Sequence, residues 1–387
     1  MKDKTSIVFT GDIGFDKYMD GKWDDPNIIS KEVLDFLHSG NHVLANVEGA
    51  IVSDTSTLVT GVEQRLLHTM NPQAIKVLNS MHTDIWNLDN NHIMDAGEEG
   101  ARQTLTQAKK HNIKTIGAGM NIKEASTPLI LNEAGGVGIL AVGYRRGCKP
   151  ADKDKAGCLL WNEMDLIQER IKEIKKNNRW CIIVAHGGEE FTSLPTPYTR
   201  DRYLAYLKMG ADIIVSHHPH VPMNYELIDN KAIFYSLGNF IFDTDYQRAQ
   251  FNTEKGVLLK VVLTKDKFSF ESLGILIDRE TEHIIKGELP KIFTNVPAEE
   301  YLKLEPLAAK MFIAATKRQQ IYLNPDKFKN ATDKEWEEHF LDPKRSGRVI
   351  GEGLDFHIIL PLAKQEEKKE WQKSKLEEVK DYILEQM

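Results

Sequence analysis

The chain has 387 residues, of which 41% are hydrophobic and 28% are charged, as in soluble globular proteins that bury a sizeable core. Fifty basic and 57 acidic residues give a net charge of −7 at pH 7, so neither a nucleic acid nor an anionic membrane surface is an expected partner. No segment resembles a signal peptide or a membrane span, which predicts a cytoplasmic protein. Three cysteines without a CxxC pair argue against a disulfide framework or a cysteine-based zinc site.

Strand-like and helix-like segments alternate along the first two thirds of the chain. Short segments rich in β-branched residues are typical of strands, and apolar residues at helical spacing predict amphipathic helices between them. Asn71 followed by Pro72 predicts the start of a short helix, because Asn caps helices and Pro suits the first helical position. The predicted strands lie at residues 6–10, 43–47, 84–88, 137–142, 181–185, 212–215 and 232–236. This alternation is typical of a layered α/β domain.

The C-terminal part of the chain has a different pattern. From about residue 290 the β-branched segments become sparse, and apolar residues recur at helical spacing close to the C-terminus. We therefore predict a catalytic domain at residues 1–270 and a mainly helical extension at residues 271–387. The extension is expected to pack on the first domain or to join copies of the chain in a homo-oligomer. The chemistry is expected outside it, although His339 and Asp342 could approach a cleft.

Polar residues cluster where the predicted strands end. In open α/β sheets the ligand lies outside the carboxyl ends of the strands, where the loops converge. Asp, Glu, Asn and His are residue types that hold Zn, Mn or Fe, and such a cluster is unfavourable when buried without compensation. The clusters are Gly11-Asp12, Asn46-Val47-Glu48, Asn90-Asn91-His92, His186-Gly187-Gly188, His217-His218-Pro219-His220 and Gly238-Asn239. Together they predict one dense polar site that binds a divalent metal.

Taken singly, most of these clusters have ordinary structural explanations. A Gly-Asp pair after a strand is usually a turn, and a histidine before two glycines could be a buried residue at a tight turn. The segment 216–221 is different, because three histidines within four residues around Pro219 have little structural rationale. Imidazoles two residues apart suit a metal site.

Six motifs occur in a fixed order along the chain. They are GD at 11–12, NVEG at 46–49, NNHIMDAG at 90–97, HGGEEF at 186–191, GADIIVSHHPHV at 210–221 and YSLGNFIFD at 235–243. This ordered set resembles the CapA-type proteins, a family named for poly-γ-glutamate capsule biosynthesis within the metallo-dependent phosphatase superfamily. The resemblance covers about residues 5–265. It implies an α/β calcineurin-like metallophosphatase fold, with two facing β-sheets flanked by helices and the site along one sheet edge.

The resemblance also implies a set of metal ligands. One or two ions of Mn, Fe or Zn would be bound, and two ions would clamp phosphate oxygens and lower the pKa of bound water toward ~7 to supply a hydroxide. The implied ligands are Asp12 and His220 for one ion, Asn91, His186 and His218 for a second, and Glu48 as the bridge.

Catalytic roles follow from the same resemblance. His92 would face the leaving group as general acid, and Asp12 and Glu190 would assist the chemistry. Two positions depart from the superfamily pattern: Gly14 stands where a histidine follows the first aspartate, and Glu48 replaces a shorter aspartate. By ligand counting, the ion held by Asp12 has fewer protein ligands, so we expect the other ion to bind more tightly.

Four further residues are candidates for substrate binding. Asn239 and Asp243 match family positions that orient ligands or substrate. Arg145 and Arg146 follow a predicted strand, and paired arginines suit bidentate recognition of a carboxylate or a phosphate.

Three functions are compatible with these residues. The first is a metal-dependent hydrolase, most simply of phosphoesters, with His92 as general acid. The second is a metal-independent acid/base enzyme such as a peptide epimerase, in which Asp12, His92 and Glu190 would move protons. The third is a non-catalytic factor in the assembly of an anionic polymer such as poly-γ-glutamate. The expected substrate is accordingly a small molecule, a peptide or an anionic polymer.

Overall fold

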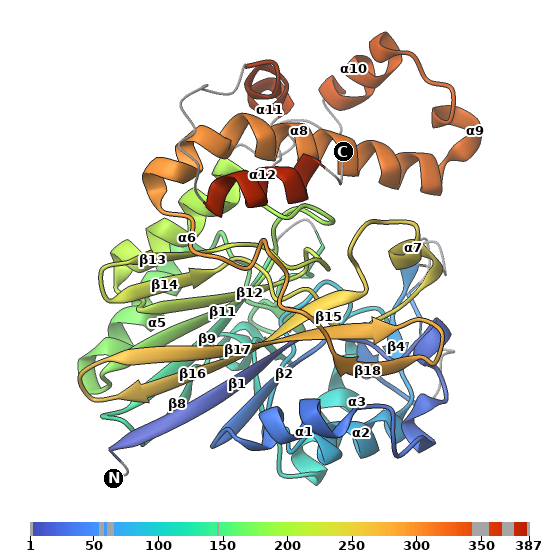
Figure 1. Cartoon of the computed structure of the whole chain (residues 1–387). Coiled ribbons are helices and arrows are strands. Elements are labelled where there is room, and N and C mark those ends of the chain that lie inside the picture. The colour runs from blue at the N-terminus through green and yellow to red at the C-terminus, as the bar shows by residue number, and fades with distance from the viewer. Residues whose placement is uncertain are drawn as a thin grey trace.

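Two β-sheets pack face to face, with helices on their outer sides (Figure 1). The computed structural model describes residues 3–53, 58–59, 66–144, 147–342, 356–365 and 375–384. The expected α/β architecture of two facing sheets flanked by helices is confirmed, and so is the mainly helical C-terminal region.

The first sheet has eight strands of mixed direction. Strand β1 (Lys4–Ile13) pairs in parallel with β2 (His42–Val47) and with β15 (Asn239–Ile241), and antiparallel with β16 (Lys255–Thr264). The strands of the first sheet, in spatial order, are β18 (His283–Lys286), β17 (Phe268–Asp278), β16 (Lys255–Thr264), β1 (Lys4–Ile13), β2 (His42–Val47), β5 (Ile85–Asn87) and β6 (Lys114–Ile116). The strand β15 (Asn239–Ile241) lies beside β1.

The second sheet has six strands, and its four central strands are parallel. In spatial order they are β13 (Tyr225–Ile228), β14 (Lys231–Phe234), β12 (Ile213–His217), β11 (Trp180–His186), β9 (Val137–Gly143) and β8 (Leu129–Leu131). Two small pairs complete the strands: β3 (Ala50–Ile51) with β4 (Thr69–Met70), and β7 (Ala118–Gly119) with β10 (Gly157–Cys158).

Helices connect the parallel strands and cover both sheets. The predicted short helix begins as expected, since the Asn71 side chain accepts a hydrogen bond from the backbone N–H of Gln73. The helices of this part are α1 (Lys31–His38), α2 (Ile75–Ser80), α3 (Gly97–Lys110), α4 (Ile122–Ala125), α5 (Met164–Asn177), α6 (Pro197–Met209) and α7 (Asp245–Arg248), with 3-10 turns at Lys17–Met19, Lys22–Asp24 and Pro72–Ala74.

The central strands are buried on both faces. On β11, Ile182 and Val184 belong to the core between the two sheets, whereas Cys181 and Ile183 belong to the core under α5 and α6. A strand with a core on each side has a continuous apolar sequence, which explains the composition of residues 181–185. The strand predicted there is confirmed.

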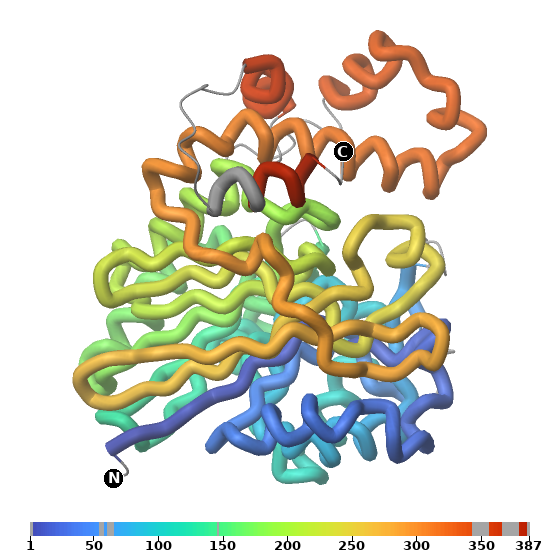
Figure 2. The backbone as a smooth tube through the Cα atoms, in the orientation of Figure 1, coloured from blue at the N-terminus to red at the C-terminus, as the bar shows by residue number. Residues whose placement is uncertain are grey.

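The C-terminal helices form a layer across one end of the sheets (Figures 1 and 2). They are α8 (Ala298–Leu323), α9 (Pro325–Phe328), α10 (Asp333–Leu341), α11 (Phe356–Ala363) and α12 (Lys375–Leu384). The strands continue past residue 270, because β17 spans it and β18 follows, and the helical part begins only at Ala298. The division into two domains stays a prediction.

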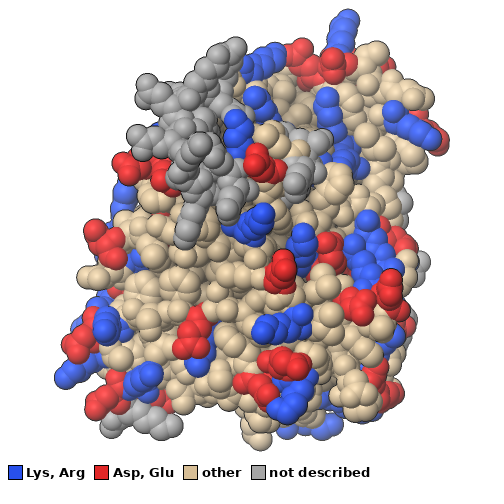
Figure 3. Space-filling view, in the orientation of Figure 1, with Lys and Arg blue, Asp and Glu red and all other residues tan. Residues whose placement is uncertain are grey.

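The surface shown in Figure 3 carries acidic and basic side chains interspersed over the two sheets. None of the helices in the described ranges combines the length and the apolar composition that a membrane crossing requires.

Candidate metal centre

The polar residues at the strand ends meet at one edge of the two sheets. In the first sheet, the register places Asp12 of β1 beside Asn46 of β2. In the second sheet, His186 ends β11, and the turn after β12 carries His218 and His220. All five are buried. They converge because parallel strands bring their carboxyl ends to the same edge of a sheet.

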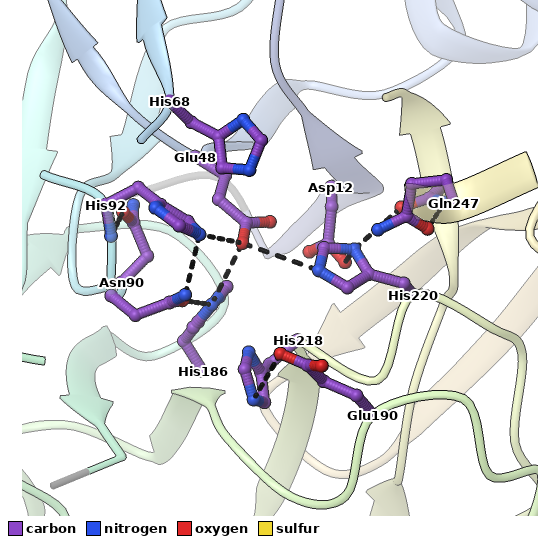
Figure 4. A network of polar contacts seen from close by, with 12 residues as sticks. Asp12, Glu48, His68, Asn90, His92, His186, Glu190, His218, His220 and Gln247 are labelled. Atoms are coloured by element: carbon purple, nitrogen blue, oxygen red, sulfur yellow. Dashed lines mark hydrogen bonds and ion pairs between the residues drawn. The ribbon is translucent and has the colours of Figure 1, made fainter. Parts of the chain in front are cut away.

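Glu48 lies at the centre of this cluster (Figure 4). Its Oε1 is 3.5 Å from Nε2 of His186, 3.7 Å from Nε2 of His220 and 3.9 Å from Nε2 of His92. The carboxylate is fully buried, and neither oxygen accepts a hydrogen bond from the described residues. Burying a carboxylate in this way is costly unless cations compensate it.

The arrangement of these side chains fits a divalent metal. Glu48, His218 and His220 present ligand atoms within 4.8 Å of one another, and Asp12, Glu48 and His186 do the same. Nδ1 of His218 is also buried without a hydrogen bond among the described residues. Carboxylates with imidazoles form the donor set that Zn, Mn and Fe prefer, so an ion here would satisfy the unpaired atoms.

These two groups divide the side chains differently from the family resemblance, which places His186 with His218 and Asp12 with His220. Asn91 joins the cluster through its Oδ1, 2.7 Å from Nε2 of His186. All the expected ligands therefore lie in one cluster, while their assignment to two separate ions stays a prediction.

Burial and neighbouring charges shift the pKa values within the cluster. Burial alone would raise the pKa of Glu48, but the charges of His220 and His186 outweigh it and hold this pKa well below its usual range. Burial lowers the pKa of His218, and the two neighbouring histidines lower it further. Burial would lower the pKa of His220 as well, yet Glu48 and Asp12 raise it to about 10. A neutral His218 suits metal ligation.

The backbone of the turn that carries two of the histidines is unusual. His218 and His220 have φ angles of 97° and 59°, in the region that residues with a Cβ rarely adopt. Such conformations cost energy and concentrate at functional sites. The positive φ angles therefore agree with a binding role for this turn.

Gly14 marks the position where the superfamily pattern has a histidine. A Cβ at residue 14 would lie 2.7 Å from the ring of Phe242, closer than packed atoms approach. The same ring lies beside His220, with 4.9 Å between the ring centroids. The Phe242 ring thus occupies the space that a side chain at residue 14 would need. This part of the cluster therefore lacks the histidine ligand of the superfamily pattern.

His92 is oriented by two hydrogen-bonding partners. Its Nδ1 is 2.7 Å from Oδ2 of Asp95, and its Nε2 is 2.7 Å from Nδ2 of Asn91. A carboxylate beside Nδ1 fixes the imidazole tautomer and directs Nε2 toward Glu48.

His68 also belongs to the site, although no sequence motif predicted it. Its ring packs edge-on against His92 at 4.3 Å between centroids, and its backbone N–H donates to Oδ2 of Asp95 over 2.8 Å. Its Nδ1 is hydrogen-bonded to Asp16. Burial would lower the pKa of His68, but the Asp16 carboxylate outweighs this effect and raises it.

We expect Asp16→Asn to lower the free energy of unfolding by roughly 1.5–3 kcal/mol at pH 6, and by less at higher pH. A raised folded-state pKa means that the pair stabilises the fold fully below the unfolded pKa of ~6.5 and loses this contribution as the pH rises through the folded-state value. Urea unfolding between pH 5.5 and 9 measures the difference. The exposed Asp20→Asn is the control, and a difference that does not change with pH would contradict the pairing.

Asn239 and Asp243 hold other parts of the site in place. Oδ1 of Asn239 is 2.9 Å from Nδ1 of His220, and its amide donates to Oε1 of Gln247 and to a backbone carbonyl. Asp243 is fully buried, and its two carboxylate oxygens pair with Arg248 and Arg279. The structure therefore surrounds both with protein partners, and a direct contact with substrate stays a prediction for each.

Glu190 borders a cavity beside the cluster. Its Oε1 is 3.9 Å from Nε2 of His218, and the Tyr246 hydroxyl donates to its Oε2 over 3.4 Å. Glu190, His218 and Asn91 line a cavity of about 280 Å³. The catalytic role of Glu190 stays a prediction.

Arg145 and Arg146 lie outside the described residues, and their role in substrate binding stays a prediction. Their neighbours Tyr144 and Gly147 line the same cavity. His217 belongs to the fold rather than to the cluster, because its Nε2 donates to the backbone carbonyl of Thr10 over 2.9 Å.

The two facing sheets with a histidine and carboxylate cluster at their shared edge define a calcineurin-like metallophosphatase fold. Residues 6–244 match the family model described as bacterial capsule synthesis protein PGA_cap. This match covers more than half of the chain, and the chain belongs to this family.

Two similar proteins come from bacilli. The chain is 30% identical over 252 residues to the PGA biosynthesis protein CapA of Bacillus subtilis (strain 168), covering 64% of this chain and 66% of that protein. It is 28% identical over 228 residues to the capsule biosynthesis protein CapA of Bacillus anthracis, covering 57% of this chain and 55% of that protein. The chain thus spans less than two thirds of the length of either relative.

Among solved structures, the crystal structure of TT1561 of Thermus thermophilus superposes with a TM-score of 0.36 and 8% identity. The superposition covers 69% of this chain and 98% of that protein.

Proposed function

We propose that this chain is a metal-dependent hydrolase that cleaves a phosphoester. The observation that supports it most is Glu48, a fully buried carboxylate whose oxygens accept no hydrogen bond in the described structure while three imidazoles lie within 3.9 Å. Such an arrangement leaves the lone pairs of the carboxylate free for a divalent ion, and carboxylates with imidazoles are the donor set that Zn, Mn and Fe prefer.

The residues of the cluster take distinct roles in this proposal. Six side chains would hold the metal: Asp12, Glu48, Asn91, His186, His218 and His220. When bound, a divalent ion supplies Lewis-acid polarisation of the phosphoryl group and activation of water. Asp95 holds the His92 imidazole through Nδ1, and His92 acts as general acid in its doubly protonated form, giving the Nε2 proton to the leaving oxygen. The Asn91 amide nitrogen that lies against Nε2 has to turn away for this step.

The proposed biological setting comes from the relatives. The proteins of Bacillus subtilis and Bacillus anthracis are named for PGA and capsule biosynthesis. We propose that this chain likewise acts in the synthesis of a polymer of the poly-γ-glutamate type.

Metal content and phosphoester turnover test the proposal together. Protein purified without chelator is expected to contain one to two equivalents of Mn, Fe or Zn by ICP-MS. It should hydrolyse p-nitrophenyl phosphate or bis(p-nitrophenyl) phosphate, and chelation should stop the reaction. Protein that binds no metal after soaking would refute the hydrolase assignment.

We expect His92→Asn to lower kcat by roughly 10²–10⁴-fold, because that is the typical contribution of a positioned general acid. The pH–rate profile should lose the limb that reports protonated His92, whereas the metal content should not change. His82→Asn, at an exposed histidine, is the matched control. An unchanged profile would remove the acid role from His92.

A metal-independent acid/base enzyme, such as a peptide epimerase, is the second candidate. This candidate is favoured by the Phe242 ring, which occupies the space beside Gly14 where the superfamily pattern has a histidine. Without that histidine, one of the two metal positions lacks a ligand. The His92–Asp95 and His68–Asp16 pairs could move protons. Chelator-insensitive incorporation of solvent deuterium into a peptide would support this candidate, and polyanion binding without any turnover would instead indicate an assembly factor.

A further inference from the structure

Helix α8 contacts the loop that follows one strand of the metal cluster. This loop, residues 187–196, comes directly after His186 of β11. The helix belongs to the C-terminal layer, outside residues 6–244, the segment that matches the family model. Residues of α8, among them Thr316, line the cavity of about 280 Å³ beside the cluster. A part of the chain beyond the family segment therefore borders the site.

Hydrogen bonds attach α8 to loop 187–196 at two separate points. The Tyr301 hydroxyl donates to the backbone carbonyl of Pro195 over 2.8 Å. The Gln319 side-chain amide donates to the backbone carbonyl of Glu190 over 3.4 Å. Because these contacts lie five residues apart in the loop and far apart on the helix, they hold most of the loop against α8.

Phe191 connects α8 with one of the expected metal ligands. Its buried ring belongs to one apolar cluster with Ala315 of α8 and with Val221. The same ring stacks on the His220 imidazole, with 6.0 Å between the ring centroids and 27° between the ring planes. Stacked and closely packed rings restrict each other's rotation. The imidazole held in this way directs Nε2 toward Glu48, whose Oε1 is 3.7 Å away (Figure 4).

Backbone hydrogen bonds join loop 187–196 to the histidine segment that follows β12. The N–H of Gly187 donates to the carbonyl of His217 over 3.0 Å, and the N–H of Phe191 donates to the carbonyl of Pro219 over 2.8 Å. Phe191 has a φ angle of 60°, in the left-handed region that two histidines of this segment also adopt. Such conformations persist only where the surroundings over-determine them, and α8 supplies part of these surroundings.

We propose that α8 is a positioning element of the metal cluster, because it holds loop 187–196 in place and, through Phe191, fixes the orientation of the His220 imidazole. The geometry of the cluster then depends on the C-terminal helices, although the six proposed ligands all lie in the first 220 residues. The inference rests on the proposed function in so far as His220 holds the metal of the hydrolase.

Amide hydrogen exchange, measured in the presence of chelator, tests whether α8 holds the loop. Exchange at Gly187 and Phe191 reports how often their hydrogen bonds open. Tyr301→Phe removes one hydrogen bond to the loop and keeps the ring, so it should accelerate exchange at both amides roughly two- to tenfold. Tyr206→Phe is the matched control, because this buried hydroxyl donates to the carbonyl of Trp161 instead. It should leave both exchange rates unchanged.

Binding of Co²⁺ to apoprotein tests the orientation of His220, since the visible absorption bands of the ion report both affinity and ligand geometry. Phe191→Leu should weaken Co²⁺ binding roughly 10- to 100-fold, as for other residues that support a ligand, and should change the absorption bands. Phe328→Leu is the matched control, because Phe328 is buried on α9 in a separate apolar cluster. Its affinity should equal that of wild type, and thermal unfolding compares the stability of both variants.

Unchanged exchange in Tyr301→Phe would overturn the inference, and so would wild-type affinity and absorption in Phe191→Leu. If Phe191→Leu does not fold, the exchange result for Tyr301→Phe decides. Wild-type protein that binds no metal would refute the hydrolase, and the exchange rates alone would then decide whether α8 holds the loop. Both effects as expected in a protein that hydrolyses no phosphoester would support the positioning role and refute the hydrolase.

Discussion

Glu48→Gln is expected to abolish metal binding and to lower phosphoester turnover by more than about 100-fold, the upper end for residues that only support a ligand. Glu48 has this effect because its carboxylate belongs to both candidate ligand groups, with Asp12 and His186 and with His218 and His220. Glutamine keeps the size of the side chain and removes the charge. ICP-MS and steady-state kinetics on the purified variant measure the two effects.

The matched control for this change is Glu190→Gln. Glu190 lies beside the same cavity but near one histidine alone, 3.9 Å from Nε2 of His218. Its variant should therefore keep the metal content of wild type. Wild-type metal content in Glu48→Gln would contradict the central place given to Glu48.

His186→Ala and His218→Ala are expected to lose most of the bound metal and to lower activity by at least about 100-fold. Each imidazole belongs to one of the two ligand groups, and both side chains are buried. The loss should be seen by ICP-MS in both variants. If His186 and His218 belong to two separate ligand groups, each single variant should keep some metal, bound by the group that the substitution leaves intact.

His217→Gln provides the comparison within the same histidine segment. His217 is buried and bonded to the carbonyl of Thr10, and a glutamine amide can donate the same hydrogen bond. This variant should bind metal like wild type, with thermal unfolding used to confirm that all three variants are folded. Equal metal content in the His186 and His218 variants and in wild type would show that the site is elsewhere.

Much of the site was predictable because its residues follow strands. Asp12, Glu48 and His186 each stand at or directly after the last residues of a buried strand, and the parallel pairing of neighbours turns this shared position in sequence into proximity in space. The order of the motifs then allowed the family to be inferred.

Other features depend on contacts between distant segments. The ring of Phe242 fills the space beside Gly14, and Asp243 is paired with Arg279. No periodicity or short motif encodes such contacts, because the first forms only when β15 pairs with β1, and the second only when the segment after β17 packs against the end of β15. The contact of α8 with the cavity has the same origin, since Thr316 and its neighbours on α8 line it, while the location of the chemistry outside the C-terminal helices stays a prediction.

The amino-acid sequence by itself determined the alternation of strands and helices, the polar strand ends and the residue types of the metal cluster, because these depend on local patterns and on the direction of neighbouring strands. Only the tertiary structure decided that His68 supports Asp95 beside His92, and that α8 closes one side of the cavity. Both contacts join parts of the chain whose mutual position is set by packing of the whole core, which no local pattern specifies.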